Sequence, residues 1–288
     1  MKIKNLVKSK KLSRSVGGNF LVFVFLLIVA AFMALPAYYS VIQSLKPIDE
    51  IFAYPPKFFV RNPTLSNFSR AFRLAGSSWV PFSRYLVNSI FISVMGTGIY
   101  VVIAALAAYP LAKSDVPGVK LLGSLVVWML LFSAEVTTIP RYIVVAKLGM
   151  IDTYFAILLP ALAGSFGVFL MRQFMGNSIP DAILEAARID GAGEHKIFWK
   201  IVMPCVKPAW LTLIIFTFQS MWGATGGNYI YSEELKTLPS VLSTIAGGGI
   251  ARAGAGCAVA VFLMLPPVII FIISQSSIMD TMAHSGMK

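Results

Sequence analysis

A group of charged side chains of both signs interrupts the apolar runs of this chain in the segment EAARIDGAGEHKIFWKIVMP, residues 185–204. Glu185, Arg188 and Asp190 are interspersed with alanines at a spacing that predicts a short helix. Small alanines let a second surface approach closely, and charges select the partner and fix its register. This is the build of a helix that docks into a groove on another protein, although in a loop of this kind a helix on the membrane surface is the more common case. An amphipathic helix lying on lipid headgroups is the alternative that these residues leave open.

Local signals predict that this segment is two short helices around a bend. Ser178 can cap the first helix, and Gly191 is expected to end it or to make the sharp turn that follows. The second helix is expected over residues 194–201, and Pro204 is expected to stop it.

Outside this segment, Glu135 is the one acid well inside an apolar run, and such a residue is a functional candidate by default. It could pair with Arg141 or Arg84, contact a substrate, or reach the lipid headgroups. His195 and His284 lie far apart with no cysteine or carboxylate cluster, so we expect no metal site.

Catalytic motifs are not apparent in the sequence. The glycine-rich stretch at 247–256 lacks the Lys-Ser/Thr ending of a phosphate-binding loop. No serine or cysteine lies in a hydrolase signature. We therefore expect a non-catalytic chain that holds no cofactor and does not hydrolyse ATP by itself.

The composition is that of a membrane protein. The chain is 57% hydrophobic and 12% charged, whereas soluble domains carry roughly a quarter charged residues. Its net charge is +12, but the basic residues are spread along the connections, so a nucleic-acid partner is not expected.

Six apolar runs approach the roughly 20 residues that a transmembrane helix needs. They cover residues 20–42, 85–112, 121–139, 153–171, 209–222 and 256–273. The sequence therefore predicts an all-α membrane protein with six spans. Residues 1–19 form a basic N-terminus, 20–288 form the transmembrane domain, and 178–208 form a polar loop between spans four and five.

The charge distribution predicts the orientation of the spans. The N-terminal segment carries Lys2, Lys4, Lys8, Lys10, Lys11 and Arg14, and basic segments remain in the cytoplasm. With six spans, both termini and the polar loop are then cytoplasmic. The external segment 44–84 is also basic and would tolerate an anionic solute; it carries Lys46, Lys57, Arg61, Arg70, Arg73 and Arg84.

The polar loop resembles the EAA loop of bacterial ABC importer permeases, whose pattern is E-A-A, three residues, G, nine residues and I-x-L-P. The matching residues are Glu185, Ala186, Ala187, Gly191, Ile201 and Pro204, and Met203 replaces the usual leucine. From Phe20 onward, the segments SLKPIDEIFAYPPKF, YLVNSIFIS and LKTLP are similar to MalG-type permeases, which serve carbohydrate uptake. The tail departs from that family at Ser276 and Ser277.

The resemblance implies a type I ABC importer in the bacterial inner membrane. This chain would form half of the pathway for a sugar or oligosaccharide, together with a homologous second permease subunit. Two ATPase subunits would bind ATP and Mg, and an extracytoplasmic solute-binding protein would deliver the solute. An ABC permease for a non-sugar solute is the alternative in the same class. A stand-alone secondary carrier using Glu135 is the alternative from another class.

Roles for individual residues follow from the resemblance. Coupling to the ATPase is implied for Glu185, Ala186, Ala187, Arg188, Asp190, Gly191 and Pro204. In this assignment the charges contact the ATPase, the alanines allow a close fit and the glycine permits the bend. Possible pathway-lining residues are Asn88, Ser89, Glu135, Gln219 and Trp222, although such residues more often serve helix packing.

Overall fold

The computed structural model describes residues 16–76 and 79–285, and within these ranges its regular structure is helical. The first half contains α1 (Val16–Leu45), α2 (Ile48–Ile51), α3 (Ser66–Ala75), α4 (Phe82–Lys113), α5 (Val119–Met129), α6 (Ala134–Lys147), α7 (Phe155–Leu162) and α8 (Ser165–Ser178). The second half contains α9 (Asp181–Ile189), α10 (Glu194–Ile197), the π-helix η1 (Phe198–Val202), α11 (Met203–Cys205), α12 (Lys207–Trp222), η2 (Glu233–Leu235), α13 (Leu238–Ala246), η3 (Ile250–Arg252) and α14 (Ala253–Ser285). The basic N-terminal cluster from Lys2 to Arg14 lies outside the described residues.

Four helical segments of the described chain are long and apolar enough to cross a membrane. They are Gly17–Leu45, Phe82–Lys113, Phe155–Ser178 and Ala253–Gln275. A bent pair of helices, Glu194–Cys205 and Lys207–Trp222, makes a fifth if it counts as one span, with a 78° bend between its halves. These five contain the expected spans one, two, four, six and five.

The predicted third span is not one continuous helix. The structure ends α5 at Met129 and begins α6 at Ala134, which interrupts the apolar run expected over 121–139. Ser133 is extended (φ −72°, ψ 154°) and hydrogen-bonds to the carboxylate of Glu135 in the first turn of α6. A serine before an acidic first turn is a helix-start signal, and here it overrides the apolar pattern.

Two boundaries of the polar loop also differ from the prediction. Ser178 is the last residue of α8 rather than a cap, and Pro180 precedes the first residue of α9. Pro204 lies inside α11, and the bend comes two residues later at Val206. The π-helix η1 leads directly into α11, so Pro204 lies two residues before the bend rather than at the end of the helix.

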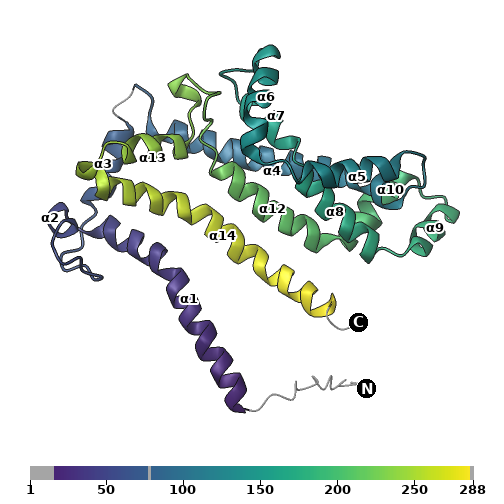
Figure 1. The fold of residues 1–288 in the computed structure, drawn as a ribbon, viewed down its shortest axis with the longest axis horizontal. Helices are drawn as coiled ribbons and strands as arrows, with labels where there is room; N and C mark the ends of the chain where they lie inside the picture. The colour runs from purple at the N-terminus through teal and green to yellow at the C-terminus, as the bar shows by residue number, and fades with distance from the viewer. Residues whose placement is uncertain (1–15, 77–78, 286–288) are drawn as a thin grey trace.

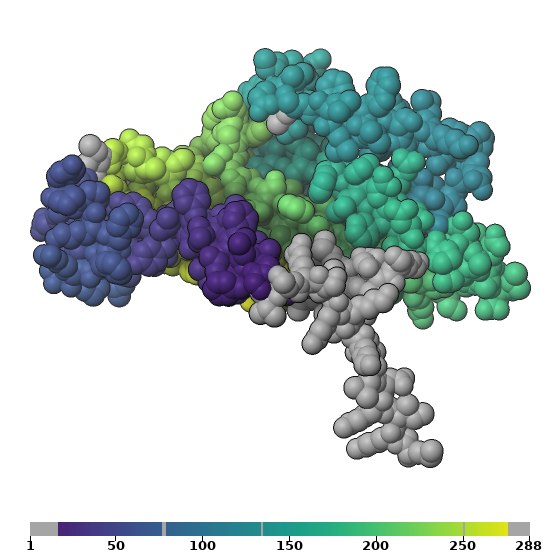
Figure 2. Space-filling model, turned by 60° about the horizontal axis from the view of Figure 1, so that its bottom comes forward, coloured from purple at the N-terminus to yellow at the C-terminus, as the bar shows by residue number. Residues whose placement is uncertain are grey.

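The helices are arranged around α4. Figure 1 shows α2, α3 and α13 gathered at one end of α4, and α9 and α10 at the opposite end. Figure 2 shows the same separation, with the blue surface of the α2–α3 segment far from the green surface that follows α8. The helix α1 extends away from this body and contacts it through α14 and α3.

One face of α4 explains its central position. Its buried residues recur every three or four positions, and most are small: Tyr85, Asn88, Ser89, Ile92, Ser93, Gly96, Thr97, Tyr100, Val101, Ala104, Ala105 and Ala108. Small residues let helices approach closely in lipid, where packing and hydrogen bonds replace the hydrophobic effect between helices. Both α8 and α12 pack against this face.

A tyrosine between α4 and α8 shows how close this packing is. The Tyr100 hydroxyl donates a 2.8 Å hydrogen bond to the Gly164 carbonyl and accepts one of 2.8 Å from the Gly167 N–H. A Cβ at Gly167 would lie 2.6 Å from the Tyr100 hydroxyl oxygen, so only glycine fits there without a shift.

We predict that Gly167→Ala destabilises the chain by about 1–3 kcal/mol, because the added methyl group separates α4 from α8. The measurement is thermal unfolding of the full chain in detergent. Gly98→Ala is the matched control, since Gly98 is also helical but a Cβ there meets nothing within 4 Å. If both variants unfold at the same temperature, the contact with Tyr100 does not limit this packing.

Candidate functional site

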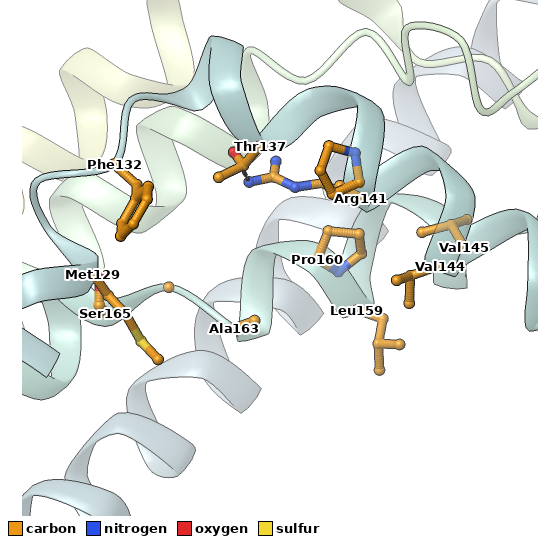
Figure 3. A pocket seen from close by; sticks show the side chains of 12 residues that line it. Met129, Phe132, Thr137, Arg141, Val144, Val145, Leu159, Pro160, Ala163 and Ser165 are labelled. Atoms are coloured by element: carbon orange, nitrogen blue, oxygen red, sulfur yellow. Dashed lines mark hydrogen bonds between the residues drawn. The ribbon is translucent and has the colours of Figure 1, made fainter. Parts of the chain in front are cut away.

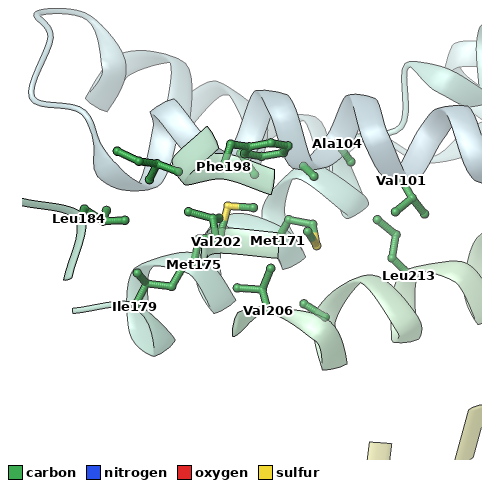
Figure 4. Packing of buried hydrophobic residues seen from close by; sticks show 14 of the residues in the cluster. Val101, Ala104, Met171, Met175, Ile179, Leu184, Phe198, Val202, Val206 and Leu213 are labelled. Atoms are coloured by element: carbon green, nitrogen blue, oxygen red, sulfur yellow. The ribbon is translucent and has the colours of Figure 1, made fainter. Parts of the chain in front are cut away.

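The helix α9 lies on the surface at one end of the molecule and is anchored from beneath. Its inward side chains, Leu184 and Ala187, are buried in an apolar cluster that includes Ile197, Phe198 and Val202 (Figure 4). The structure therefore buries one of the two alanines expected at a partner interface.

The opposite side of α9 is open. Glu185 and Ala186 are exposed, and Ile189 is exposed to 86%. Asp181 at the N-terminus of α9 and Arg188 near its C-terminus complement the helix dipole. The outward side of α9 therefore presents a carboxylate and an apolar side chain together.

Gly191 makes the turn that follows α9. Its φ of +76° lies in the left-handed region, as the sequence predicted for this position. The N–H of Ala192 bonds to the carbonyl of Ala187 at 3.0 Å and closes the turn. Asp190 is exposed at the same turn, and α10 starts at Glu194.

Arg188 does not point away from the protein as a free charge. Its Nε lies 2.8 Å from Oε1 of Glu194, and the hydroxyl of Tyr109 donates a 2.7 Å hydrogen bond to Oε2 of the same carboxylate. The hydrogen bond to Glu194 raises the pKa of the Arg188 guanidinium above its usual value. No local pattern predicts this contact, because Tyr109 and Glu194 are 85 residues apart in the chain.

At the start of α9 a second ion pair joins the same part of α4. The ammonium of Lys113 lies 2.7 Å from Oδ1 of Asp181 and 2.6 Å from the carbonyl of Ile179. Tyr109, Lys113, Arg188 and Glu194 help to line a cavity of about 530 Å³ between the end of α4 and α9.

Three of the predicted pathway residues are buried and hydrogen-bonded to neighbouring segments. The buried Asn88 amide donates to the carbonyls of Glu234 (2.7 Å) and Lys236 (2.9 Å). The Ser89 hydroxyl accepts from the N–H of Leu238 at 2.8 Å. The buried Trp222 indole donates to a carbonyl of α14 at 2.8 Å.

The other two candidates, Gln219 and Glu135, remain accessible. Gln219 is exposed on α12 and lines a cavity of about 210 Å³ beside α14. Glu135 is exposed at the start of α6, and the ion pairs found among the described residues do not include it. Its suggested partners bond elsewhere: Arg84 to the carbonyl of Glu234, and Arg141 to the hydroxyl of Thr137.

A larger cavity lies where α5, α6, α7 and α8 meet. It has a volume of about 620 Å³, and Figure 3 shows Arg141 and Thr137 of α6 beside the otherwise largely apolar side chains that line it. The residues of its wall include Met129, Phe132, Leu159, Pro160 and Ser165. Sequence reasoning considered Arg141 only as a partner for Glu135, because only the broken third span reveals this cavity.

The loop after α6 is fixed by an aspartate. Asp152 accepts hydrogen bonds from the N–H groups of Tyr231 (2.9 Å) and Ser232 (2.8 Å) and from the Ser232 hydroxyl. These bonds, chiefly from the Ser232 side chain, lower the pKa of the carboxyl group. They hold the segment beyond the cavity to the segment that precedes α13.

The described residues contain no group of three or more His, Cys, Asp or Glu side chains that could hold a metal ion. Cys205 and Cys257 are free thiols.

A solved structure shares this fold. It is a bacterial ABC transporter involved in the import of the acidic polysaccharide alginate, and the two chains align with a TM-score of 0.75 at 23% identity. The alignment covers 91% of this chain and 98% of the other, so almost the whole helical arrangement is common to both.

Characterised relatives match over most of their length. The polygalacturonan/rhamnogalacturonan transport system permease protein YtcP of Bacillus subtilis is 32% identical over 221 residues, which are 77% of this chain and 74% of the relative. The arabinooligosaccharides transport system permease protein AraQ of Halalkalibacterium halodurans is 30% identical over 234 residues, which are 78% and 80%. Residues 119–278 match the family described as binding-protein-dependent transport system inner membrane component. The chain therefore belongs to this family of ABC importer permeases.

Proposed function

We propose that this chain forms half of the translocation pathway of an oligosaccharide importer. A homologous permease subunit would form the other half, two ATPase subunits would bind ATP and Mg, and a solute-binding protein would deliver the substrate from outside. The carbohydrate transport named for the relatives YtcP and AraQ supports this proposal.

The proposal requires six spans, with α5 and α6 together forming the third. Helix α5 is apolar but only 11 residues long, so it needs α6 to complete a crossing. The basic N-terminus then lies in the cytoplasm with the C-terminus and α9, while α2, α3 and α13 lie on the external side.

The exposed side of α9 is the surface that we propose for contact with the ATPase. Leu184 and Ala187 hold α9 to the body, whereas Glu185, Ala186 and Ile189 are presented outward at the end of the molecule. We propose that an ATPase subunit receives this side in a surface groove, and that ATP-driven closure of the ATPase pair moves α9. Asp190 and Gly191 fix the turn beside this contact, and Pro204 lies in the bent segment that follows.

The cavity beside Arg141 supports an acidic substrate. Arg141 is exposed among largely apolar walls, and the ion pairs of the described residues do not include it. A guanidinium binds a carboxylate through paired hydrogen bonds, whereas a neutral sugar gains little from a full charge. The relative YtcP is named for polygalacturonan and rhamnogalacturonan transport, and a galacturonan carries carboxylates, which agrees with this assignment.

The two alternatives have less support. A non-sugar solute would use the same machinery and remains an outcome of uptake measurements. A stand-alone carrier built on Glu135 is not favoured, because the chain belongs to an importer family and Glu135 lies exposed at a helix start. Affinity purification of the tagged chain from its native host tests the assembly: an ATPase and a second permease should co-purify in comparable amounts.

We predict that Glu185→Lys reduces co-purification of the ATPase by about tenfold or more, because losing one partner of an interfacial charge pair costs several kcal/mol. Insertion into the membrane should be unchanged, and uptake should be abolished. Asp49→Lys, the same charge reversal on an exposed residue of α2, is the control and should retain the ATPase. Wild-type uptake with Glu185→Lys would remove Glu185 from the contact.

For the substrate, we predict that Arg141→Gln raises the half-saturating concentration of uronic-acid oligosaccharides by roughly tenfold to a hundredfold. The estimate follows from the 1.5–3 kcal/mol typical of a hydrogen bond to a charged group. Arg141→Lys keeps the charge, so its half-saturating concentration should lie between those of the wild type and of Arg141→Gln. Radiolabelled uptake into cells measures the effect, with neutral hexose oligosaccharides as the comparison. Equal losses for acidic and neutral substrates would contradict a carboxylate contact.

A further inference from the structure

Both ends of the short helix α9 are bonded to the last turn of α4. The start of α9 is bonded through Asp181 to Lys113, and its end is bonded through Arg188 and Glu194 to Tyr109. Tyr109 and Lys113 are four residues apart, so they project from the same face of α4. A single turn of α4 therefore holds a helix of nine residues at two points.

The first contact is the more enclosed of the two. The Lys113 side chain is only 6% exposed. Its ammonium donates to the carboxylate of Asp181, the first residue of α9, and to the carbonyl of Ile179, two residues earlier. An enclosed ammonium that lost its carboxylate would keep only the carbonyl, and leaving a buried charge without its partner is costly.

The second contact is a network of three side chains. The Glu194 carboxylate accepts from Arg188 with one oxygen and from Tyr109 with the other, at 2.8 and 2.7 Å. An isolated surface ion pair stabilises little. Here, however, the phenol is fixed by ring contact with the buried Phe198, at a centroid distance of 5.6 Å. The ring of Tyr109 is therefore held in place within this network.

Apolar contact alone would not fix the direction of α9. The packing of Leu184 and Ala187 is non-directional, and an open cavity of about 530 Å³ separates part of α9 from α4. The two charged contacts bridge this space and prevent α9 from rolling or sliding on its apolar anchor.

We infer that the two contacts join α9 and the inner end of α4 into one mechanical unit, with Lys113, Arg188 and Glu194 as positioning residues that transmit displacement of α9 to α4. Arg188, whose side chain is 46% exposed, is thereby assigned to a contact within the permease and not to a contact with the ATPase. The inference rests on the proposed function, in which the ATPase moves α9.

The first test measures whether the contacts hold α9. Hydrogen–deuterium exchange of the α9 amides, followed by mass spectrometry on the full chain in detergent, should be about tenfold faster in Asp181→Asn and in Arg188→Glu, because tenfold corresponds to 1.4 kcal/mol of opening free energy. The swapped pair Arg188→Glu/Glu194→Arg should restore most of the protection. Lys120→Glu, an equal charge reversal on an exposed residue of α5, is the control and should not change it. Unchanged hydrogen–deuterium exchange of the α9 amides in both Asp181→Asn and Arg188→Glu overturns the inference.

The second test measures transmission in the assembled importer. With Cys205 and Cys257 replaced by serine, Phe132→Cys places a single reactive thiol in the cavity beside Arg141. ATP with orthovanadate should change its rate of labelling by a charged maleimide, and Arg188→Glu should reduce that change severalfold while the ATPase stays bound and hydrolyses ATP.

The outcomes separate the two proposals. Loss of ATPase binding in Glu185→Lys but not in Arg188→Glu supports both. Loss of ATPase binding in Arg188→Glu assigns this residue to the interface and overturns the positioning role. An equal labelling response in the wild type and in Arg188→Glu overturns transmission. A wild-type importer without any response contradicts the proposed pathway and transmission through it, while the exchange measurement still decides whether the contacts hold α9.

Discussion

Close approach of α8 and α12 to the small-residue face of α4 is the constraint on which the other features depend. Lipid is as apolar as the side chains, so burying apolar surface between helices gains little free energy in a membrane. Short contacts and internal hydrogen bonds must hold the helices together instead. Tyr100 provides both, since its hydroxyl bonds to Gly164 and Gly167 where a Cβ would not fit.

Polar side chains at both ends of α4 also form hydrogen bonds to neighbouring segments. At one end Asn88 and Ser89 bond to backbone groups of the segment that enters α13. At the other end Tyr109 and Lys113 bond to the segment around α9. At both ends a polar side chain of α4 therefore bonds to a neighbouring segment, and a buried donor or acceptor gains from such a partner in a medium without water.

The same helix also relates the two functional regions. Gly164, whose carbonyl accepts from Tyr100, lines the cavity that contains Arg141. Nine residues further along α4, Tyr109 bonds to the network at the end of α9. A short series of contacts along α4 therefore connects the Tyr109 end of this helix with the wall of the cavity.

The membrane class, most of the spans, the turn at Gly191 and the resemblance to the permease family could be predicted from the amino-acid sequence, because apolar runs, glycine positions and the EAA spacing are local properties. Which charged side chains are paired is visible only in the folded protein. Glu185 and Arg188 look equivalent on one helix, but Arg188 is bonded to Glu194 and Tyr109, whereas Glu185 is exposed. The break after Met129 and the cavity beside Arg141 were equally unpredictable, because a weak helix-start signal competes there with a strong apolar run. Contacts between residues far apart in the chain leave no local pattern, and these contacts decide which charged side chains are paired within the protein.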